Sequence, residues 1–210
     1  MPNATFFRLP EDKQKRIYDA TVAEFSEYRF TDASINRIIK AAGIPRGSFY
    51  QYFNDKEDLY LYVLEQIAKE KLEILSQYQS PESKAGFIEG ILTSIPDIFD
   101  WLDRCPAYNR IGLLMIQDSS DFIQNIITKM RSVSNEFIAY LEKDRSRGNI
   151  REGVDLNLVM EMYISIGITI VKEYYASGDR ETCTRRVKAV FDILQNGILC
   201  REKSDEPNDS

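Results

Sequence analysis

Apolar residues recur at helical spacing through most of this 210-residue chain, and this pattern constrains the fold more than any other feature. Phe87, Ile91, Ile95 and Phe99, for example, repeat every four residues, which places them on one face of a helix. No stretch combines sustained alternation of apolar and polar residues with hairpin turns such as Asn-Gly or Asp-Gly. The sequence therefore predicts an all-α fold.

Turn and capping residues indicate where the helices begin and end. Ser34 and Asp155 are expected N-caps, because their side chains can accept hydrogen bonds from free backbone amides. Gly43 stands where a helix ends in the left-handed backbone region, and Pro45 suits the first turn of the next helix. Pro96 is expected to kink the helix that contains it. The predicted helices cover residues 11–28, 35–42, 45–53, 56–79, 87–99, 108–117, 122–141, 156–175 and 183–201.

Composition excludes several classes of protein. Lysine and arginine number 27 against 33 acidic residues, so the net charge of −6 excludes a wholesale basic coat but permits a local basic patch. The chain has no histidine, which excludes Ser-His-Asp and Cys-His catalytic pairs and histidine-ligated zinc. The three cysteines form neither a CxxC pair nor a disulfide framework. We expect no catalytic residue, no metal ion and no cofactor, and hence no enzyme.

Two features bear on the compartment. The first sixteen residues have no apolar segment of the kind that a secretory signal contains. The longest nearly uncharged apolar stretch, residues 162–171, is much shorter than a membrane span. We therefore expect a cytoplasmic protein without a membrane partner.

The segment from Ile35 to Lys56, INRIIKAAGIPRGSFYQYFNDK, carries the most specific chemistry. Two short helices separated by a turn that contains glycine have the spacing of a helix-turn-helix, whose second helix can enter the major groove of DNA. Residues 33–56 carry a net charge of +3, whereas residues 1–60 as a whole are neutral. The positive charge is thus concentrated where it could attract phosphate.

The outer face of the second helix offers donors for both bases and phosphates. Arg46 and Gln51 can donate to guanine and adenine edges, and hydroxyl groups can reach phosphate oxygens. Gly47 lets backbone approach DNA closely, and Lys56 stands at a helix start that favours an anion. The alternative is a plain helical hairpin whose aromatic residues only pack. The candidate DNA-binding residues are Ser34, Asn36, Arg46, Gly47, Ser48, Tyr50, Gln51, Tyr52 and Lys56.

The stretch from Phe30 to Leu59, FTDASINRIIKAAGIPRGSFYQYFNDKEDL, resembles the TetR family, the tetracycline-repressor-like bacterial transcription regulators. Two positions depart from the family pattern. Ala33 stands where the family often has threonine, and Pro45 stands where serine or threonine commonly caps the recognition helix. Both departures affect contacts that would contribute to operator affinity.

The resemblance implies a three-helix DNA-binding head and a larger C-terminal helical domain. The expected domains are residues 1–55 for the head, 56–79 for a connecting helix, 80–202 for ligand binding and dimerisation, and 203–210 for a flexible tail. The family also implies a homodimer through the last two helices, which would read a palindromic double-stranded DNA operator. An apolar stripe on the last helix agrees with this and consists of Val187, Val190, Phe191, Leu194 and Ile198.

The resemblance further implies a ligand pocket, and methionine and aromatic residues suit a small hydrophobic effector. We therefore expect a ligand-responsive regulator that represses transcription. The alternatives are a helical enzyme or lipid carrier, and a ligand-blind DNA-binding factor. The candidate pocket residues, for each of which plain core packing is the alternative, are Phe87, Ile91, Phe99, Trp101, Tyr108, Met115, Phe122, Met130, Tyr163 and Tyr174.

Overall fold

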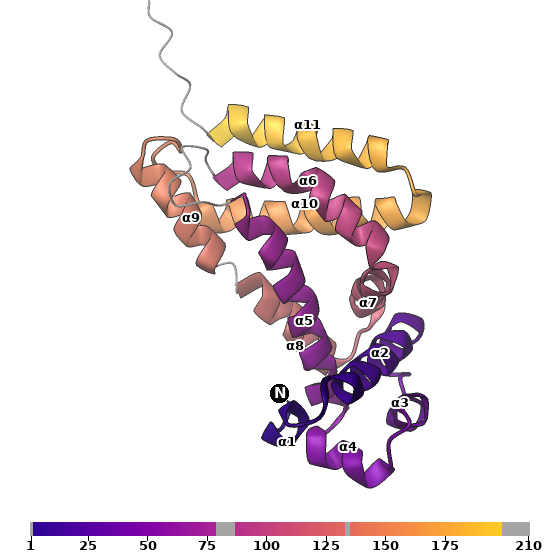
Figure 1. Cartoon of the computed structure of the whole chain (residues 1–210). Coiled ribbons are helices and arrows are strands. Elements are labelled where there is room, and N and C mark those ends of the chain that lie inside the picture. The colour runs from indigo at the N-terminus through magenta and orange to yellow at the C-terminus, as the bar shows by residue number, and fades with distance from the viewer. Residues whose placement is uncertain (1, 79–86, 133–134, 199–210) are drawn as a thin grey trace, which may run out of the picture. The chain divides into compact units, whose positions relative to one another are not determined.

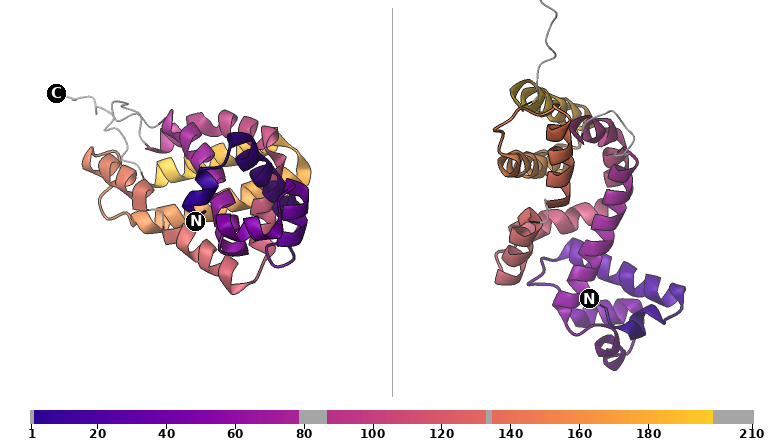
Figure 2. Two further views of the ribbon diagram at one scale, coloured as in Figure 1. Left: turned by 60° about the horizontal axis from the view of Figure 1, so that its bottom comes forward. Right: turned by 90° about the vertical axis from the view of Figure 1, so that its left-hand side faces the viewer.

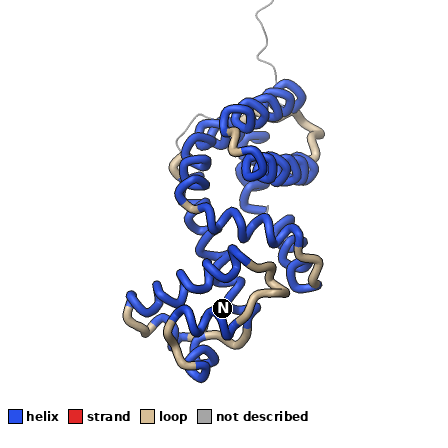
Figure 3. Tube along the Cα trace, turned by 90° about the vertical axis from the view of Figure 1, so that its right-hand side faces the viewer, coloured by secondary structure: helices blue, strands red, loops and turns tan. Residues whose placement is uncertain are grey.

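The computed structural model describes residues 2–78, 87–132 and 135–198. Within these ranges the chain consists of helices joined by loops, without a strand (Figure 3). The all-α prediction is therefore confirmed. The helices are α1 (Ala4–Phe7), α2 (Glu11–Glu27), α3 (Ile35–Ala42), α4 (Arg46–Tyr52), α5 (Lys56–Ser76), α6 (Phe87–Arg104), α7 (Pro106–Gln117), α8 (Asp121–Ser132), α9 (Asn135–Ser146), α10 (Leu156–Ser177) and α11 (Arg180–Ile198).

Packing divides the chain into two compact units. Unit 1 comprises residues 1–74 and 97–128, and unit 2 comprises residues 75–96 and 129–210. Helices α5, α6 and α8 each continue from one unit into the other. The domain boundaries expected after residues 55 and 79 remain predictions, and residues 79–86 and 199–210 lie outside the described part of the chain.

Unit 1 is built around an aromatic core. Phe25 of α2 packs edge-on against Tyr60 of α5, with 4.7 Å between the ring centroids. Phe49 of α4 stacks on Phe53, which directly follows that helix, and both side chains are buried. Helix α2 packs against α3 and α7 in the same unit. This core fixes the position of α4.

In unit 2, α10 and α11 lie side by side (Figure 2). Val159 and Met160 of α10 and Phe191 of α11 are buried in their shared core. The carboxylate of Asp155 accepts hydrogen bonds from the amides of Asn157 and Leu158, so the predicted N-cap of α10 is confirmed.

Most predicted helices match the structure within a few residues, with two differences. Residues 122–141 were expected to form one helix, but the structure has two, α8 and α9. The sequence did not reveal the junction because apolar residues keep helical spacing across it. Helix α1 was not expected at all. In the described part of the chain no helix is both long enough and apolar enough to cross a membrane.

Candidate nucleic-acid interface

Helices α3 and α4 are joined by a turn of three residues. Gly43 ends α3 with a φ of 64°, in the left-handed region that glycine adopts without steric cost. Ile44 donates its backbone amide to the carbonyl of Ile39, which closes the turn. Pro45 stands before the first residue of α4 with a φ of −64°. The expected helix-turn-helix therefore forms.

One face of α4 is anchored in the core and the other is open. Phe49 and Tyr52 are buried, whereas Arg46, Gly47 and Gln51 are exposed. Tyr50 is 50% exposed although its ring contacts that of Phe49. A Cβ added at Gly47 would meet no atom within 4 Å, so the backbone there is open to close approach. These residues form the exposed face of α4, with Ser48 half-buried at its edge.

Tyr52 does not lie on this face, so the prediction that placed it there was wrong. Its side chain is only 5% exposed because the ring packs against that of Phe6. Its hydroxyl accepts a hydrogen bond of 3.2 Å from the Lys13 ammonium. At a spacing of 3.6 residues per turn, position 52 follows Phe49 onto the inner side of the helix.

The ammonium group of Lys56 binds to backbone groups of its own chain. The group donates to the backbone carbonyls of Thr31 and Ala33 and lies 4.6 Å from the centre of the Phe30 ring. Burial lowers the pKa of the Lys56 ammonium. The side chain thus holds the segment between α2 and α3, and contact of Lys56 with phosphate stays a prediction.

The start of α3 depends on a residue that the sequence analysis missed. Ser34 occupies the N-cap position, but its side chain makes no capping hydrogen bond. Instead its amide donates to the buried carboxylate of Glu24 at 2.7 Å. The Arg37 guanidinium donates to both oxygens of the same carboxylate, and these hydrogen bonds raise the pKa of Arg37. Asn36 remains exposed on α3.

A second missed residue, Asp118, holds the middle of the segment between α2 and α3. Its carboxylate accepts hydrogen bonds from the amide and hydroxyl of Thr31 and from the amide of Ser120. Burial alone raises the pKa of Asp118, but the hydrogen bonds from Ser120 and Thr31 outweigh it and the pKa lies below its ordinary value. No spacing rule links positions 31 and 118, so sequence offered no signal for this contact.

The candidate effector residues fall into both packing units. Phe99, Trp101 and Met115 are buried in unit 1, where Tyr108 and Phe122 are half-buried. In unit 2, Ile91 and Tyr174 are buried and Tyr163 is half-buried. The side chains of Phe87 and Met130 lie outside the described part of the chain.

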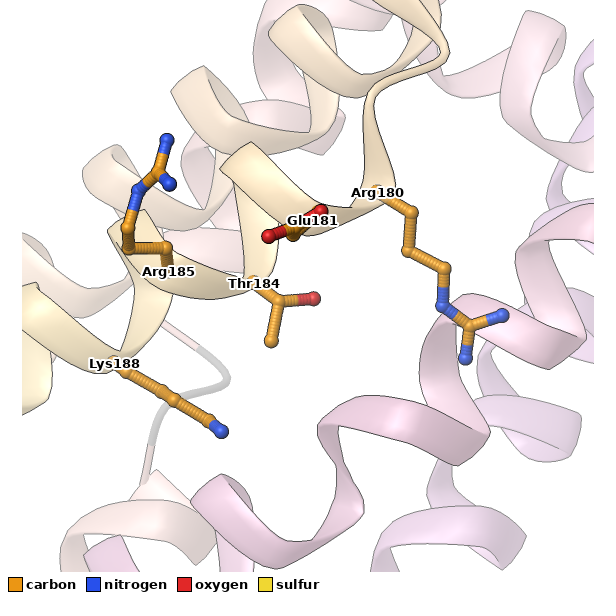
Figure 4. A pocket seen from close by; sticks show the side chains of 5 residues that line it. All are labelled: Arg180, Glu181, Thr184, Arg185 and Lys188. Atoms are coloured by element: carbon orange, nitrogen blue, oxygen red, sulfur yellow. The ribbon is translucent and has the colours of Figure 1, made fainter.

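A hollow of about 550 Å³ in unit 2 is lined by charged and polar side chains of α11 rather than by those candidates. Its cationic side chains point in different directions around the carboxylate of Glu181, so they do not converge on one point (Figure 4). Among the described residues, no group of three or more acidic or cysteine side chains could hold a metal ion. The lining residues are Arg180, Glu181, Thr184, Arg185 and Lys188.

Comparison with known proteins identifies the helix-turn-helix. Residues 17–63 match the profile of "Bacterial regulatory proteins, tetR family". The HTH-type transcriptional regulator AcrR of Shigella flexneri is 31% identical over 172 residues, which cover 80% of this chain and 76% of AcrR. This chain belongs to the TetR family. It is therefore a DNA-binding transcriptional regulator.

Two further comparisons extend over most of this TetR-family regulator. An HTH-type transcriptional repressor of Mycobacterium tuberculosis is 24% identical over 186 residues, which cover 89% of this chain and 92% of the repressor. The structure of the Bacillus subtilis transcriptional regulator FadR in complex with stearoyl-CoA is similar with a TM-score of 0.70 at 22% identity. That match covers 88% of this chain and 98% of FadR. The second likeness shows a common fold along nearly the whole chain.

Proposed function

We propose that this regulator is a homodimeric repressor that reads a palindromic operator with α4 and is released by a small hydrophobic effector. The exposed face of α4 is the observation that carries the proposal. Arg46 and Gln51 are open to base edges, and the opposite side of the helix is fixed by Phe49. A short helix held in this way presents donors in a defined register, as base recognition requires.

Exposed apolar residues on α10 and α11 support the homodimer. Leu158 and Met162, one turn apart on α10, are 54% and 42% exposed, and Ile193 of α11 is 69% exposed. Large apolar side chains that lie exposed on neighbouring helices of one subunit are typical of an interface with a second subunit. These residues, rather than the expected stripe, are our candidates for that interface.

The stripe expected on α11 contributes to the core of its own subunit. Phe191 is buried against α10, and Val187 and Val190 pack on the same core. The side chains of Leu194 and Ile198 lie outside the described part of the chain. Helical spacing predicted an apolar face correctly, but it does not show whether that face meets the same chain or another.

The relatives support repression and suggest a chemical class for the effector. The M. tuberculosis relative is a named repressor, and the FadR structure holds a long-chain acyl thioester. We propose an effector with a long apolar chain, bound by a subset of the candidate pocket residues. To change operator occupancy from 99:1 to 1:99, such an effector must favour the released state by about 5.5 kcal/mol.

Helix α5 is our candidate for the element that transmits this preference. It begins at Lys56, with three residues between it and α4, and Leu59 and Tyr60 are buried in the aromatic core that holds α4. A shift of α5 would therefore move α4 with it. In a symmetric dimer this motion would change the separation of the two recognition helices, which must match half-sites about 34 Å apart.

The proposal is tested with duplexes recovered by the protein from a random-sequence library. Fluorescence anisotropy then measures affinity for a recovered duplex as stearoyl-CoA, stearate or free coenzyme A is added. We expect two subunits per duplex, and release by one of the apolar ligands but not by coenzyme A. Binding that no apolar ligand weakens would favour the ligand-blind factor, and one subunit per duplex would contradict the dimer.

A further inference from the structure

The short helix α1 lies beside the carboxyl end of α4 (Figure 1). The last four carbonyl groups of a helix have no partner within the helix and need one elsewhere. Two of those carbonyl groups in α4 accept hydrogen bonds from α1 and its N-cap residue. The amide of Asn3 donates to the carbonyl of Tyr52 at 2.7 Å, and the hydroxyl of Thr5 donates to the carbonyl of Gln51.

The side chain of Asn3 is also directed to α4. Asparagine at an N-cap position usually accepts hydrogen bonds from its own helix, yet Asn3 makes no such bond to α1. Its side-chain amide instead donates to the carbonyl of Gln51 at 3.4 Å. The carbonyl of Gln51 thus receives hydrogen bonds from two side chains of the segment Asn3–Phe7.

Phe6 anchors this segment to the head. Its side chain is fully buried, and its ring lies 5.0 Å from that of Phe53 and 5.3 Å from that of Tyr62, centre to centre. The segment is therefore held by the same aromatic core that holds α4. Its hydrogen-bond donors stay opposite the end of the recognition helix.

We propose that the segment Asn3–Phe7 is a C-terminal cap of the recognition helix and positions Gln51 for base readout. The inference rests on the proposed function of α4. A helix of seven residues is too short to be stable alone, so its last turn depends on outside partners. Fixing the backbone of Gln51 before DNA arrives reduces the ordering that specific binding must impose.

The test replaces Thr5 by valine, which has the same shape but no hydroxyl, and by serine, which keeps the hydroxyl. We expect Thr5→Val to weaken binding to a library-selected duplex by about three- to ten-fold, the factor that one neutral hydrogen bond supplies. Binding to random duplex should not change, because phosphate contacts dominate it. Thr5→Ser should restore the selected affinity. Thr128→Val, which removes a hydroxyl bonded within α8, is the matched control.

Amide hydrogen exchange supplies a readout that is independent of DNA. In Thr5→Val the amides from Phe49 to Phe53 should exchange faster, while those of α3 should not. Unchanged exchange together with unchanged selectivity would overturn the proposal, as would equal losses of affinity for selected and random duplexes. If the wild-type protein itself preferred no duplex, the proposed function would fail, and the exchange result alone would decide whether the cap exists.

Discussion

The Arg37 guanidinium lies with Nη2 2.6 Å from Oε1 of Glu24, and Oε1 also accepts the backbone amide of Ser34 at 2.7 Å. One buried carboxylate therefore holds both the first turn of α3 and the residue before it. Since α3 is the first helix of the helix-turn-helix, this arrangement fixes the position at which the motif begins.

Replacing Glu24 by leucine should lower the free energy of unfolding by about 2 kcal/mol, because it leaves the Ser34 amide without its buried acceptor. Thermal or urea unfolding measures the change. Asp19→Asn removes an exposed ion pair with Lys15 on the same helix and should change stability by less than about 0.5 kcal/mol. Equal effects of the two substitutions would contradict the role of Glu24.

Asp118 predicts a specific dependence of stability on pH. Its pKa in the folded protein is below the ordinary 3.8, so its contribution is complete above that value and is lost as pH falls through the lowered pKa. Asp118→Asn should cost about 1–2 kcal/mol at pH 6, the difference between charged and neutral acceptors. The difference in unfolding free energy between wild type and variant should shrink toward pH 2. A constant difference would refute the assignment.

Trp101 gives a direct optical probe of a half-buried polar cluster. Its indole N–H and the hydroxyl of Tyr108 donate to the two oxygens of Glu70, at 3.0 and 3.1 Å. Glu70→Leu should cost about 2 kcal/mol and shift the emission of this single tryptophan to shorter wavelength. Glu65→Leu, at an exposed position of the same helix, should leave the spectrum unchanged. An unshifted spectrum in Glu70→Leu would count against the hydrogen bond.

The proposed subunit interface predicts that Ile193→Glu converts the protein to monomers. A buried charge without a partner at that position would cost more than the contact contributes. Sedimentation or light scattering measures the mass. Leu72→Glu, at another large exposed apolar residue, is the control and should leave the mass unchanged. A dimer that survives Ile193→Glu would exclude that residue from the interface.

The sequence predicted what local rules determine. The turn at Gly43, the cap by Asp155 and the helix-turn-helix all follow from residues within a few positions of one another. Tyr52 was predicted to face DNA because it has a hydroxyl group. Its position one turn after Phe49 instead places it on the buried side of the helix.

Contacts between distant residues left no such signal. The hydrogen bonds from Asn3 and Thr5 to the end of α4 span more than forty positions, and that of Thr31 with Asp118 spans 87. Each is a specific donor and acceptor pair that many sequences could supply. Only the packed structure shows which pairs meet.

Base readout by α4 is the central claim, and selection from a random-sequence duplex library by wild-type and variant proteins tests it most directly. We expect the wild type to enrich a palindrome. Gln51→Ala should lose preference at the same position of both half-sites, with about ten-fold weaker binding to the wild-type duplex. Lys188→Ala, on α11, should recover the wild-type palindrome. Recovery of an identical motif at equal affinity by Gln51→Ala and Arg46→Ala would contradict the claim.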